Sequence, residues 1–171
     1  MTFFLIGFMG SGKTHWGKIW ASKYGFAFID LDEAIEKLEG KPIAAIFEIK
    51  GEDYFRKVES ETLKSLDNIE NTIIACGGGT PCYFENLQWM QEKGTTIYLS
   101  TTAQEILQRV YEEQEKRPLL KTMNQAELLF FIEQKLKERA AFYNAANIII
   151  PTAQLTEHSF GDLLSSLQSS L

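Results

Sequence analysis

Hydrophobic residues gather in short runs along the chain, and stretches with helical spacing separate these runs. Each run is about four residues long, apolar without strict alternation and rich in residues that favour β-strands. Unbroken runs of this kind are typical of strands that are buried on both faces, as in a parallel sheet. The expected strands are Phe3–Ile6, Phe26–Ile29, Thr72–Ala75, Thr96–Leu99 and Ile148–Ile150.

The intervening segments place apolar residues three or four positions apart, which predicts amphipathic helices. Because strands alternate with helices, we expect an α/β fold with helices on both sides of a parallel sheet. No repeat, low-complexity tract or linker interrupts the pattern, so residues 1–171 are expected to form one domain. The expected helices are Lys13–Tyr24, Glu52–Leu66, Ala103–Glu115, Gln125–Ala145 and a closing helix Thr156–Leu171.

The composition of the chain indicates which kinds of ligand it can bind. The net charge is −6 and the Lys and Arg residues are scattered, which argues against a surface for nucleic acid or anionic membrane. No apolar stretch approaches the length of a membrane span. The two cysteines are too few for a disulfide scaffold and lack the spacing of a zinc site. We therefore expect a cytoplasmic protein that binds small molecules.

Residues 7–14 read Gly-Phe-Met-Gly-Ser-Gly-Lys-Thr and match the phosphate-binding loop pattern G-x-x-x-x-G-K-[ST]. The loop falls between an expected strand and an expected helix, where backbone N–H groups and the helix N-terminus attract phosphate. Lys13 would place a charge at the β- and γ-phosphates, and Thr14 would offer its hydroxyl to Mg²⁺. Since little chain remains for switch regions, the pattern favours a small-molecule kinase over a GTPase or motor. The residues expected to hold the nucleotide are Gly10, Ser11, Gly12, Lys13 and Thr14.

Two carboxylates, Asp30 and Asp32, end the second expected strand at the sheet edge where open α/β folds bind ligands. Alternation along an extended segment would point both to one side. One carboxylate can then hold Mg²⁺ through water while the other accepts or orients the attacking hydroxyl. The alternative for Asp32 is that it caps the helix that follows.

Glycines and arginines complete the set of candidates. Gly77-Gly78-Gly79 follow the third expected strand and permit close approach of a ligand to the backbone, or serve only as a flexible connection. Arg56, Arg117 and Arg139 are candidates for gripping an anionic substrate and stabilising transferred charge. Each has a surface alternative, such as an i,i+3 pair between Arg56 and Glu59.

These segments occur together in the order and near the spacing of one known family. They are Gly7–Thr14, Asp30-Leu31-Asp32, Gly51–Arg56 with Glu59, Gly77–Gly79, Lys116-Arg117-Pro118-Leu119-Leu120, and Glu138-Arg139 with Tyr143. On these residues the chain resembles the shikimate kinase family over essentially its whole length. Departures from the family pattern include Cys76, which precedes the glycines where Thr is usual.

The resemblance implies a P-loop fold of three α/β/α layers with five parallel strands in the order 2-3-1-4-5. It also implies a shikimate-binding region over about residues 31–60 and a mobile lid over about residues 112–123. The charge pattern of that second segment fits either a flap or a helix end followed by an ordinary loop.

The implied reaction is Mg²⁺-dependent transfer of the ATP γ-phosphoryl group to the 3-hydroxyl of shikimate. We expect a monomer, because so small an architecture of this kind buries its own core. Asp32 would be the base and Asp30 would reach Mg²⁺ through water. The implied ligand contacts are Arg56, Arg139, Gly78 and Gly79 to shikimate, Arg117 from the lid to the phosphates, Arg109 stacked on adenine, and Thr152 in the adenine loop.

Two rival functions share the loop. Another small-molecule kinase, acting on gluconate or a nucleoside monophosphate, would need different acceptor contacts from those that the arginines and glycines suggest. A catalytically silent nucleotide sensor would bind ATP without needing Asp32 or Arg117.

Overall fold

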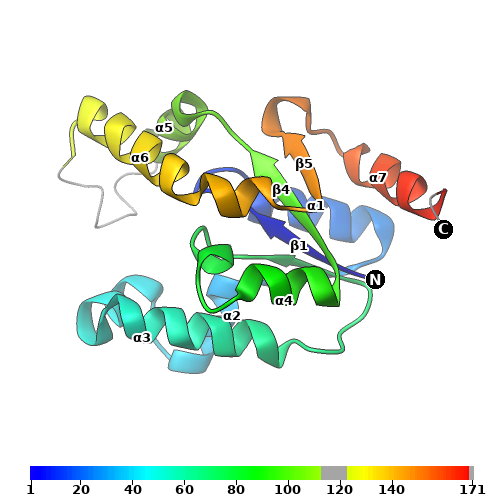
Figure 1. The fold of residues 1–171 in the computed structure, drawn as a ribbon, viewed down its shortest axis with the longest axis horizontal. Coiled ribbons are helices and arrows are strands. Elements are labelled where there is room, and N and C mark those ends of the chain that lie inside the picture. Colours follow the sequence, from blue (N-terminus) through cyan, green and yellow to red (C-terminus); the bar gives the residue numbers. More distant parts are fainter. Residues whose placement is uncertain (113–122, 170–171) are drawn as a thin grey trace.

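A computed structural model describes residues 1–112 and 123–169, and its centre is a five-stranded parallel sheet (Figure 1). The strand order is β2-β3-β1-β4-β5, as the family resemblance implies. All the carboxyl ends therefore meet at one edge, which faces left in Figure 1. The strands are β1 Thr2–Ile6, β2 Ala27–Asp30, β3 Thr72–Ala75, β4 Thr95–Ser100 and β5 Ile148–Pro151.

Helices follow the strands and include α2, which the sequence predicts only as the helix after Asp32, and α4, which is absent from the expected set. Helix α3 also begins at Ile43 instead of Glu52, because two helical segments meet at Gly51, whose φ of 82° breaks the helix between them. The helices are α1 Lys13–Tyr24, α2 Leu31–Glu39, α3 Ile43–Ser65, α4 Asn86–Lys93, α5 Ala103–Glu112, α6 Gln125–Asn144 and α7 Ser159–Gln168, with short 3-10 turns at Thr80–Cys82 and Thr152–Gln154.

Alternate residues of the central strands enter two separate hydrophobic cores. Phe3 and Leu5 of β1 pack with Trp20 of α1 and with residues of α7. Phe4 and Ile6 pack on the opposite face, against residues of α2, α3 and α4. Because both faces are covered, β1 and β3 are buried at every position, and each is apolar after its first residue, a threonine. The expectation of burial on both faces is wrong for the edge strands β2 and β5, which are partly exposed.

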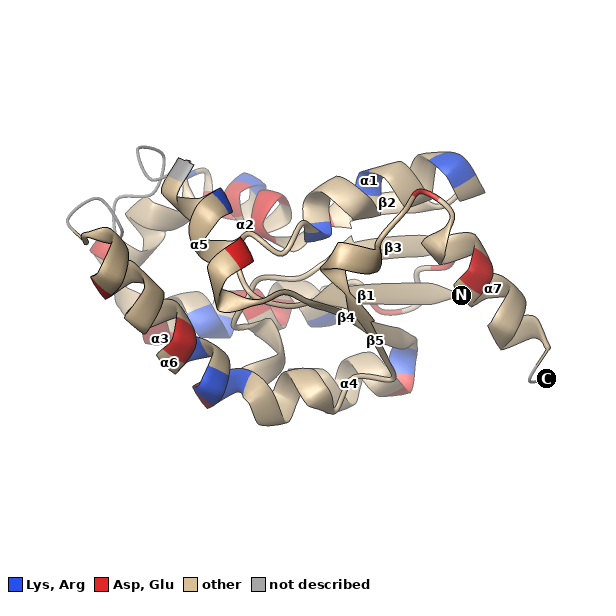
Figure 2. Ribbon diagram, turned by 90° about the horizontal axis from the view of Figure 1, so that it is seen from above, with Lys and Arg blue, Asp and Glu red and all other residues tan. Residues whose placement is uncertain are grey.

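A third hydrophobic cluster packs the phosphate-binding loop against α5 and α6. Phe8 of the loop packs among residues of α5 and α6, including Ile106, Val110 and Ile132. Basic and acidic positions are interspersed over the helices (Figure 2). Within residues 1–112 and 123–169, no helix combines the length and apolarity needed to cross a membrane.

Candidate active site

The phosphate-binding loop wraps around the amino end of α1 at the carboxyl edge of the sheet. Gly10 and Gly12 have φ of 76° and 87°, a left-handed conformation that glycine adopts without a Cβ clash. Lys13 lies back over the loop and donates from Nζ to the carbonyls of Gly7 and Phe8, at 2.8 and 2.9 Å. The loop is thus closed around its own lysine, whose charge lies beside the N-terminus of α1.

Asp30 joins this loop to the start of α2. Its Oδ2 accepts a 2.7 Å hydrogen bond from the Thr14 hydroxyl, and its Oδ1 accepts from the backbone N–H groups of Asp32 and Glu33 at 3.0 and 3.4 Å. Asp30 is therefore the N-cap of α2, and the alternative that Asp32 caps this helix is wrong. The expected strand alternation is wrong as well, because Leu31 already begins the helix.

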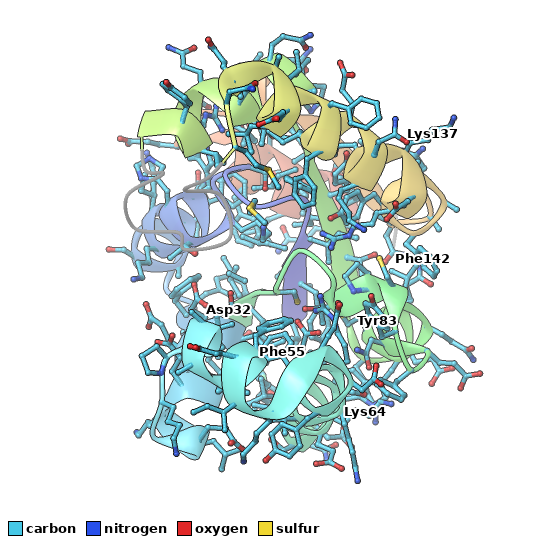
Figure 3. All side chains as sticks on the ribbon, turned by 90° about the vertical axis from the view of Figure 1, so that its left-hand side faces the viewer. Asp32, Phe55, Lys64, Tyr83, Lys137 and Phe142 are labelled. Carbon is cyan, nitrogen blue, oxygen red and sulfur yellow. The ribbon has the colours of Figure 1, made fainter. Side chains whose placement is uncertain are left out.

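Asp32 lies in the first turn of α2, on the side that faces the sheet edge (Figure 3). Burial, followed by the charges of Asp30 and Glu59, raises its pKa from 3.8 to about 6, although Lys13 opposes part of the shift. Such a carboxyl is still ionised at neutral pH, but it accepts a proton more readily than an ordinary aspartate does. Its position and pKa suit a general base.

The glycine run Gly77–Gly79 leaves room for charged side chains of the protein itself. A Cβ atom would lie 2.5 Å from Glu59 Oε1 at Gly77, 3.2 Å from Arg139 Nη1 at Gly78 and 2.6 Å from Arg56 Nη1 at Gly79. Real Cβ atoms do not sustain contacts under 3.0 Å, so a side chain at Gly77 or Gly79 would force Glu59 or Arg56 to move. The flexible-connection alternative does not account for these contacts.

Arg56 is buried on α3 and lies against Gly79. It donates from Nη1 to Glu59 Oε2 at 2.9 Å, and from Nε and Nη2 to Glu52 Oε1 at 3.2 and 3.1 Å. The Tyr83 ring stacks over the guanidinium, with 4.6 Å between Cζ and the ring centroid. Burial alone lowers the pKa of Arg56, but Glu59 and Glu52 more than compensate and raise it. The i,i+3 pair with Glu59 therefore exists, but inside the site instead of on the surface.

Arg139 reaches the same place from α6. Its guanidinium lies over the Phe8 ring, 5.5 Å from the centroid, and next to Gly78. Its neighbour Glu138 pairs with a lysine of the same helix, so Arg139 is not simply a surface partner of Glu138. The Tyr143 hydroxyl donates to the Gly78 carbonyl at 2.6 Å, and burial raises the pKa of Tyr143 to about 12.

Arg109 and Thr152 lie on the nucleotide side. Arg109, on the exposed side of α5, donates from Nη1 to the Gly10 carbonyl at 2.9 Å. Thr152 follows β5 and is buried, and within the described residues its Oγ1 has no hydrogen-bond partner. Ser11 Oγ is in the same situation inside the phosphate-binding loop. Arg117 and the expected lid, apart from its end residues Glu112 and Met123, lie outside the described residues.

The two cysteines have different surroundings. Cys76 Sγ turns into the core and lies 3.6 Å from Met90 Sδ, and burial raises its pKa. Cys76 is thus a buried residue of the core in this structure. Cys82 is half-buried near Arg139 and Arg56, and burial raises its pKa against the effect of both charges.

The sequence does not predict that Thr80 and Tyr83 contribute to the acceptor side, nor that Glu59 holds Arg56 in place there. For Glu59 the i,i+3 spacing from Arg56 was the available signal. Thr80 and Tyr83 follow the glycine run and carry no local pattern. Their roles depend on contacts with α3, 21 residues away in the case of Thr80 and Glu59.

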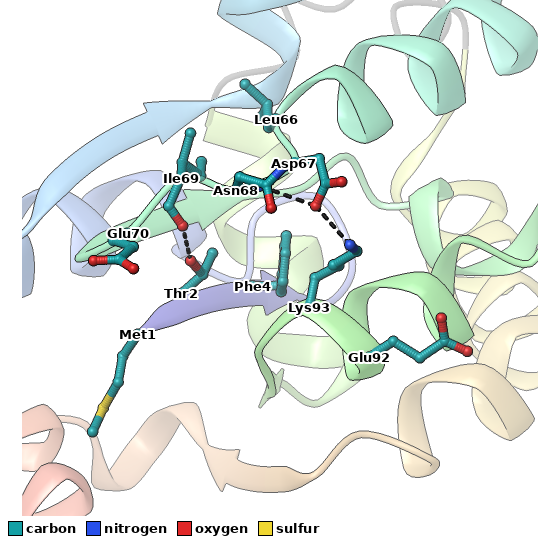
Figure 4. A pocket seen from close by; sticks show the side chains of 10 residues that line it. All are labelled: Met1, Thr2, Phe4, Leu66, Asp67, Asn68, Ile69, Glu70, Glu92 and Lys93. Carbon is teal, nitrogen blue, oxygen red and sulfur yellow. Dashed lines mark hydrogen bonds and ion pairs between the residues drawn. The ribbon is translucent and has the colours of Figure 1, made fainter.

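A separate hollow lies at the opposite, amino-terminal edge of the sheet (Figure 4). Thr2, Phe4, Asp67 and Lys93 contribute to its lining, and Lys93 pairs with Asp67 at 2.8 Å. None of the candidate catalytic or phosphate-binding residues lines it. The carboxyl edge therefore remains the candidate active site.

Comparisons with known proteins agree with this geometry. A family model described as shikimate kinase matches residues 9–168. A shikimate kinase of Parabacteroides distasonis is 38% identical over 169 residues, which is 98% of each chain. The crystal structure of shikimate kinase from Bacteroides thetaiotaomicron superimposes with a TM-score of 0.91 at 35% identity, covering 99% of this chain and 98% of that one. Shikimate kinase from Acinetobacter baumannii, in complex with shikimate, gives 0.85 at 33% identity, covering 99% and 93%.

Proposed function

The chain belongs to the shikimate kinase family, and from this premise we propose that it transfers the γ-phosphoryl group of ATP to the 3-hydroxyl of shikimate. The products are shikimate 3-phosphate and ADP. The observation that carries the proposal is the meeting, at one sheet edge, of a carboxyl of raised pKa, Asp32, with the arginines Arg56 and Arg139. For a substrate that carries both a hydroxyl and a carboxylate, the carboxyl group can accept the proton of the hydroxyl and the arginines can bind the carboxylate.

On the nucleotide side, Gly10, Ser11 and Gly12 would direct backbone N–H groups at the phosphates, and Lys13 would turn from the loop carbonyls to the β- and γ-phosphates. The adjoining oxygens of Thr14 and Asp30, 2.7 Å apart, suit Mg²⁺, which prefers oxygen ligands and usually keeps several waters. We propose that Thr14 binds the ion directly and Asp30 through water. When bound, Mg²⁺ neutralises charge on the phosphates.

On the acceptor side, Arg56 and Arg139 would bind the carboxylate of shikimate through charge-assisted hydrogen bonds. The backbone of Gly78 and Gly79 would add further contacts. Asp32 would orient the 3-hydroxyl and accept its proton as the oxygen attacks phosphorus in line, so no covalent phosphoenzyme forms. Catalysis then depends on position and charge.

The remaining assignments extend the same proposal. Arg109 would stack on adenine, Thr152 would lie in the adenine loop, and Arg117, carried by the lid over about residues 112–123, would stabilise the transferring phosphoryl group. We further propose that the enzyme works in the cytoplasm as a one-domain monomer. Both of its cysteines are free thiols, which agrees with a reducing compartment.

The test is an ADP-release assay with Mg·ATP and a panel of shikimate, gluconate, AMP and CMP. Turnover is expected with shikimate alone, and it should be lost in Asp32→Asn. Turnover with a different acceptor would keep the kinase but refute shikimate as substrate. ATP binding without any turnover would favour the sensor.

A further inference from the structure

Thr80 follows the three glycines directly and is fully buried at the start of the 3-10 turn Thr80–Cys82. Its hydroxyl donates a 2.6 Å hydrogen bond to Oε1 of Glu59, which is also fully buried. Oε2 of the same carboxylate accepts from Arg56 Nη1 at 2.9 Å. Glu59 therefore uses one oxygen to hold the arginine and needs the threonine for the other.

The backbone of Thr80 is itself held by two hydrogen bonds. Its N–H donates to the Gly77 carbonyl at 3.2 Å, and its carbonyl accepts from Asn86 Nδ2 at 2.9 Å. Asn86 Oδ1 accepts in turn from the Ser60 hydroxyl at 2.7 Å. Asn86 begins α4 and Ser60 belongs to α3, so the position of the Thr80 hydroxyl is set by two helices and the glycine turn.

A buried carboxylate needs a donor for each oxygen, and close packing leaves Glu59 few choices. A Cβ on Gly77 would lie 2.5 Å from Glu59 Oε1 and 3.0 Å from Thr80 Oγ1, so both oxygens press on the glycine turn. Without the Thr80 hydroxyl, Oε1 loses its donor, and the Arg56 guanidinium already bound to Oε2 can take the place of that donor. A carboxylate that turns to bind an arginine with both oxygens occupies N–H groups otherwise available to a ligand.

We propose that Thr80 is a positioning residue for the carboxylate of shikimate, acting through Glu59 on Arg56. The inference rests on the proposed function. Thr80 does not touch the substrate, because its side chain is fully buried. Its hydroxyl keeps Glu59 to a single contact with Arg56, so that the guanidinium stays against Gly79 with N–H groups free for the acceptor.

The experiment measures both Michaelis constants for Thr80→Val, Thr80→Ala and Thr80→Ser beside the wild-type protein. In the first two variants KM for shikimate should rise about tenfold while KM for ATP stays within about twofold, since only the acceptor contact is lost. Thr80→Ser keeps the hydroxyl and should restore the wild-type value. Thr80→Ala adds no methyl group beside the carboxylate, so the loss remains testable if Thr80→Val does not fold.

Thr62→Val is the matched control, because Thr62 is a buried threonine of α3, the helix that carries Glu59, and its hydroxyl has no partner in the described part of the chain. It should leave both constants unchanged. An unchanged KM for shikimate in Thr80→Val and Thr80→Ala, an equal rise in both constants, or no recovery in Thr80→Ser would overturn the inference alone. A wild-type protein without turnover on shikimate would overturn the proposed function and this inference together.

Discussion

The two halves of the active site are built differently. The nucleotide half consists of one short loop whose shape comes from left-handed glycines and whose lysine donates to the carbonyls of Gly7 and Phe8. The acceptor half is assembled from α2, α3, the glycine turn and α6, and two of its charged groups, Arg56 and Glu59, are already paired with each other. A local loop can present its backbone to a ligand, whereas a composite site must first fix its own charged groups.

The largest expected effect comes from a substitution in the nucleotide half alone. Lys13→Ala removes the charge that would face the β- and γ-phosphates, so kcat should fall by about 10³-fold, the scale for losing one group that stabilises transition-state charge. Steady-state turnover with shikimate measures the loss. Lys18→Ala is the matched control, since Lys18 lies on the same helix and forms an exposed 3.4 Å pair with Glu33. A kcat within tenfold of wild type in Lys13→Ala would contradict the role.

The next effect concerns the folding stability that is lost because the Asp32 carboxylate is buried in the acceptor half. The pKa of Asp32 is raised from 3.8 to about 6 in the folded protein, so the folded state holds a proton that the unfolded chain has already released in this window. Stability from this group is therefore lost as the pH rises from 3.8 to about 6. Asp32→Asn avoids that loss and should exceed wild type by up to about 3 kcal/mol above pH 6.

Urea unfolding at pH 4 and pH 7.5 measures this difference. The stability gain of Asp32→Asn should be small at the lower pH and largest at the higher one, while activity is absent at both. An Asp32→Asn protein that is less stable than wild type at pH 7.5 would show that the ionised carboxylate of Asp32 does not destabilise the folded protein.

A third effect tests whether the glycine turn exists for the charged side chains. In Gly79→Ala the new Cβ would meet the Arg56 guanidinium at 2.6 to 2.7 Å, so the arginine must move. KM for shikimate should rise about 10- to 100-fold, as expected for weakening a charge-assisted hydrogen bond, with KM for ATP unchanged. Gly78→Ala should have a smaller effect, because its Cβ would lie 3.2 Å from Arg139 Nη1.

Neither glycine has a left-handed φ, so Ala is compatible with the backbone and the comparison isolates the side-chain contact. Equal effects at the two positions would count against this explanation. Thermal unfolding of both variants separates a moved arginine from a general loss of stability.

The same contrast explains what could be predicted from the sequence. The loop motif and the buried strands are patterns of consecutive residues, so the P-loop, β1 and β3 follow directly from them. Strand alternation predicts that Asp30 and Asp32 lie together at the sheet edge; they do lie there, but a helix cap at Asp30 brings this about instead of alternation. Only one partner of Arg56 can be predicted from the sequence, namely Glu59, which lies one helical turn away. Gly79 and Tyr83 are distant in sequence and contact the arginine only in the folded protein.

The smallest expected effect returns to the nucleotide half. Within the described residues the buried hydroxyls of Thr152 and Thr62 both lack a hydrogen-bond partner, but only Thr152 lies at the carboxyl edge, directly after β5. Replacing either by Val removes an unsatisfied polar group and should raise stability by up to about 1 kcal/mol, or Tm by about 2 to 4 °C. Only Thr152→Val should also raise KM for ATP, by about threefold, because its hydroxyl is then missing from the adenine loop. If Thr62→Val raised KM for ATP equally, or if Thr152→Val left it unchanged, the Thr152 hydroxyl would have no part in nucleotide binding.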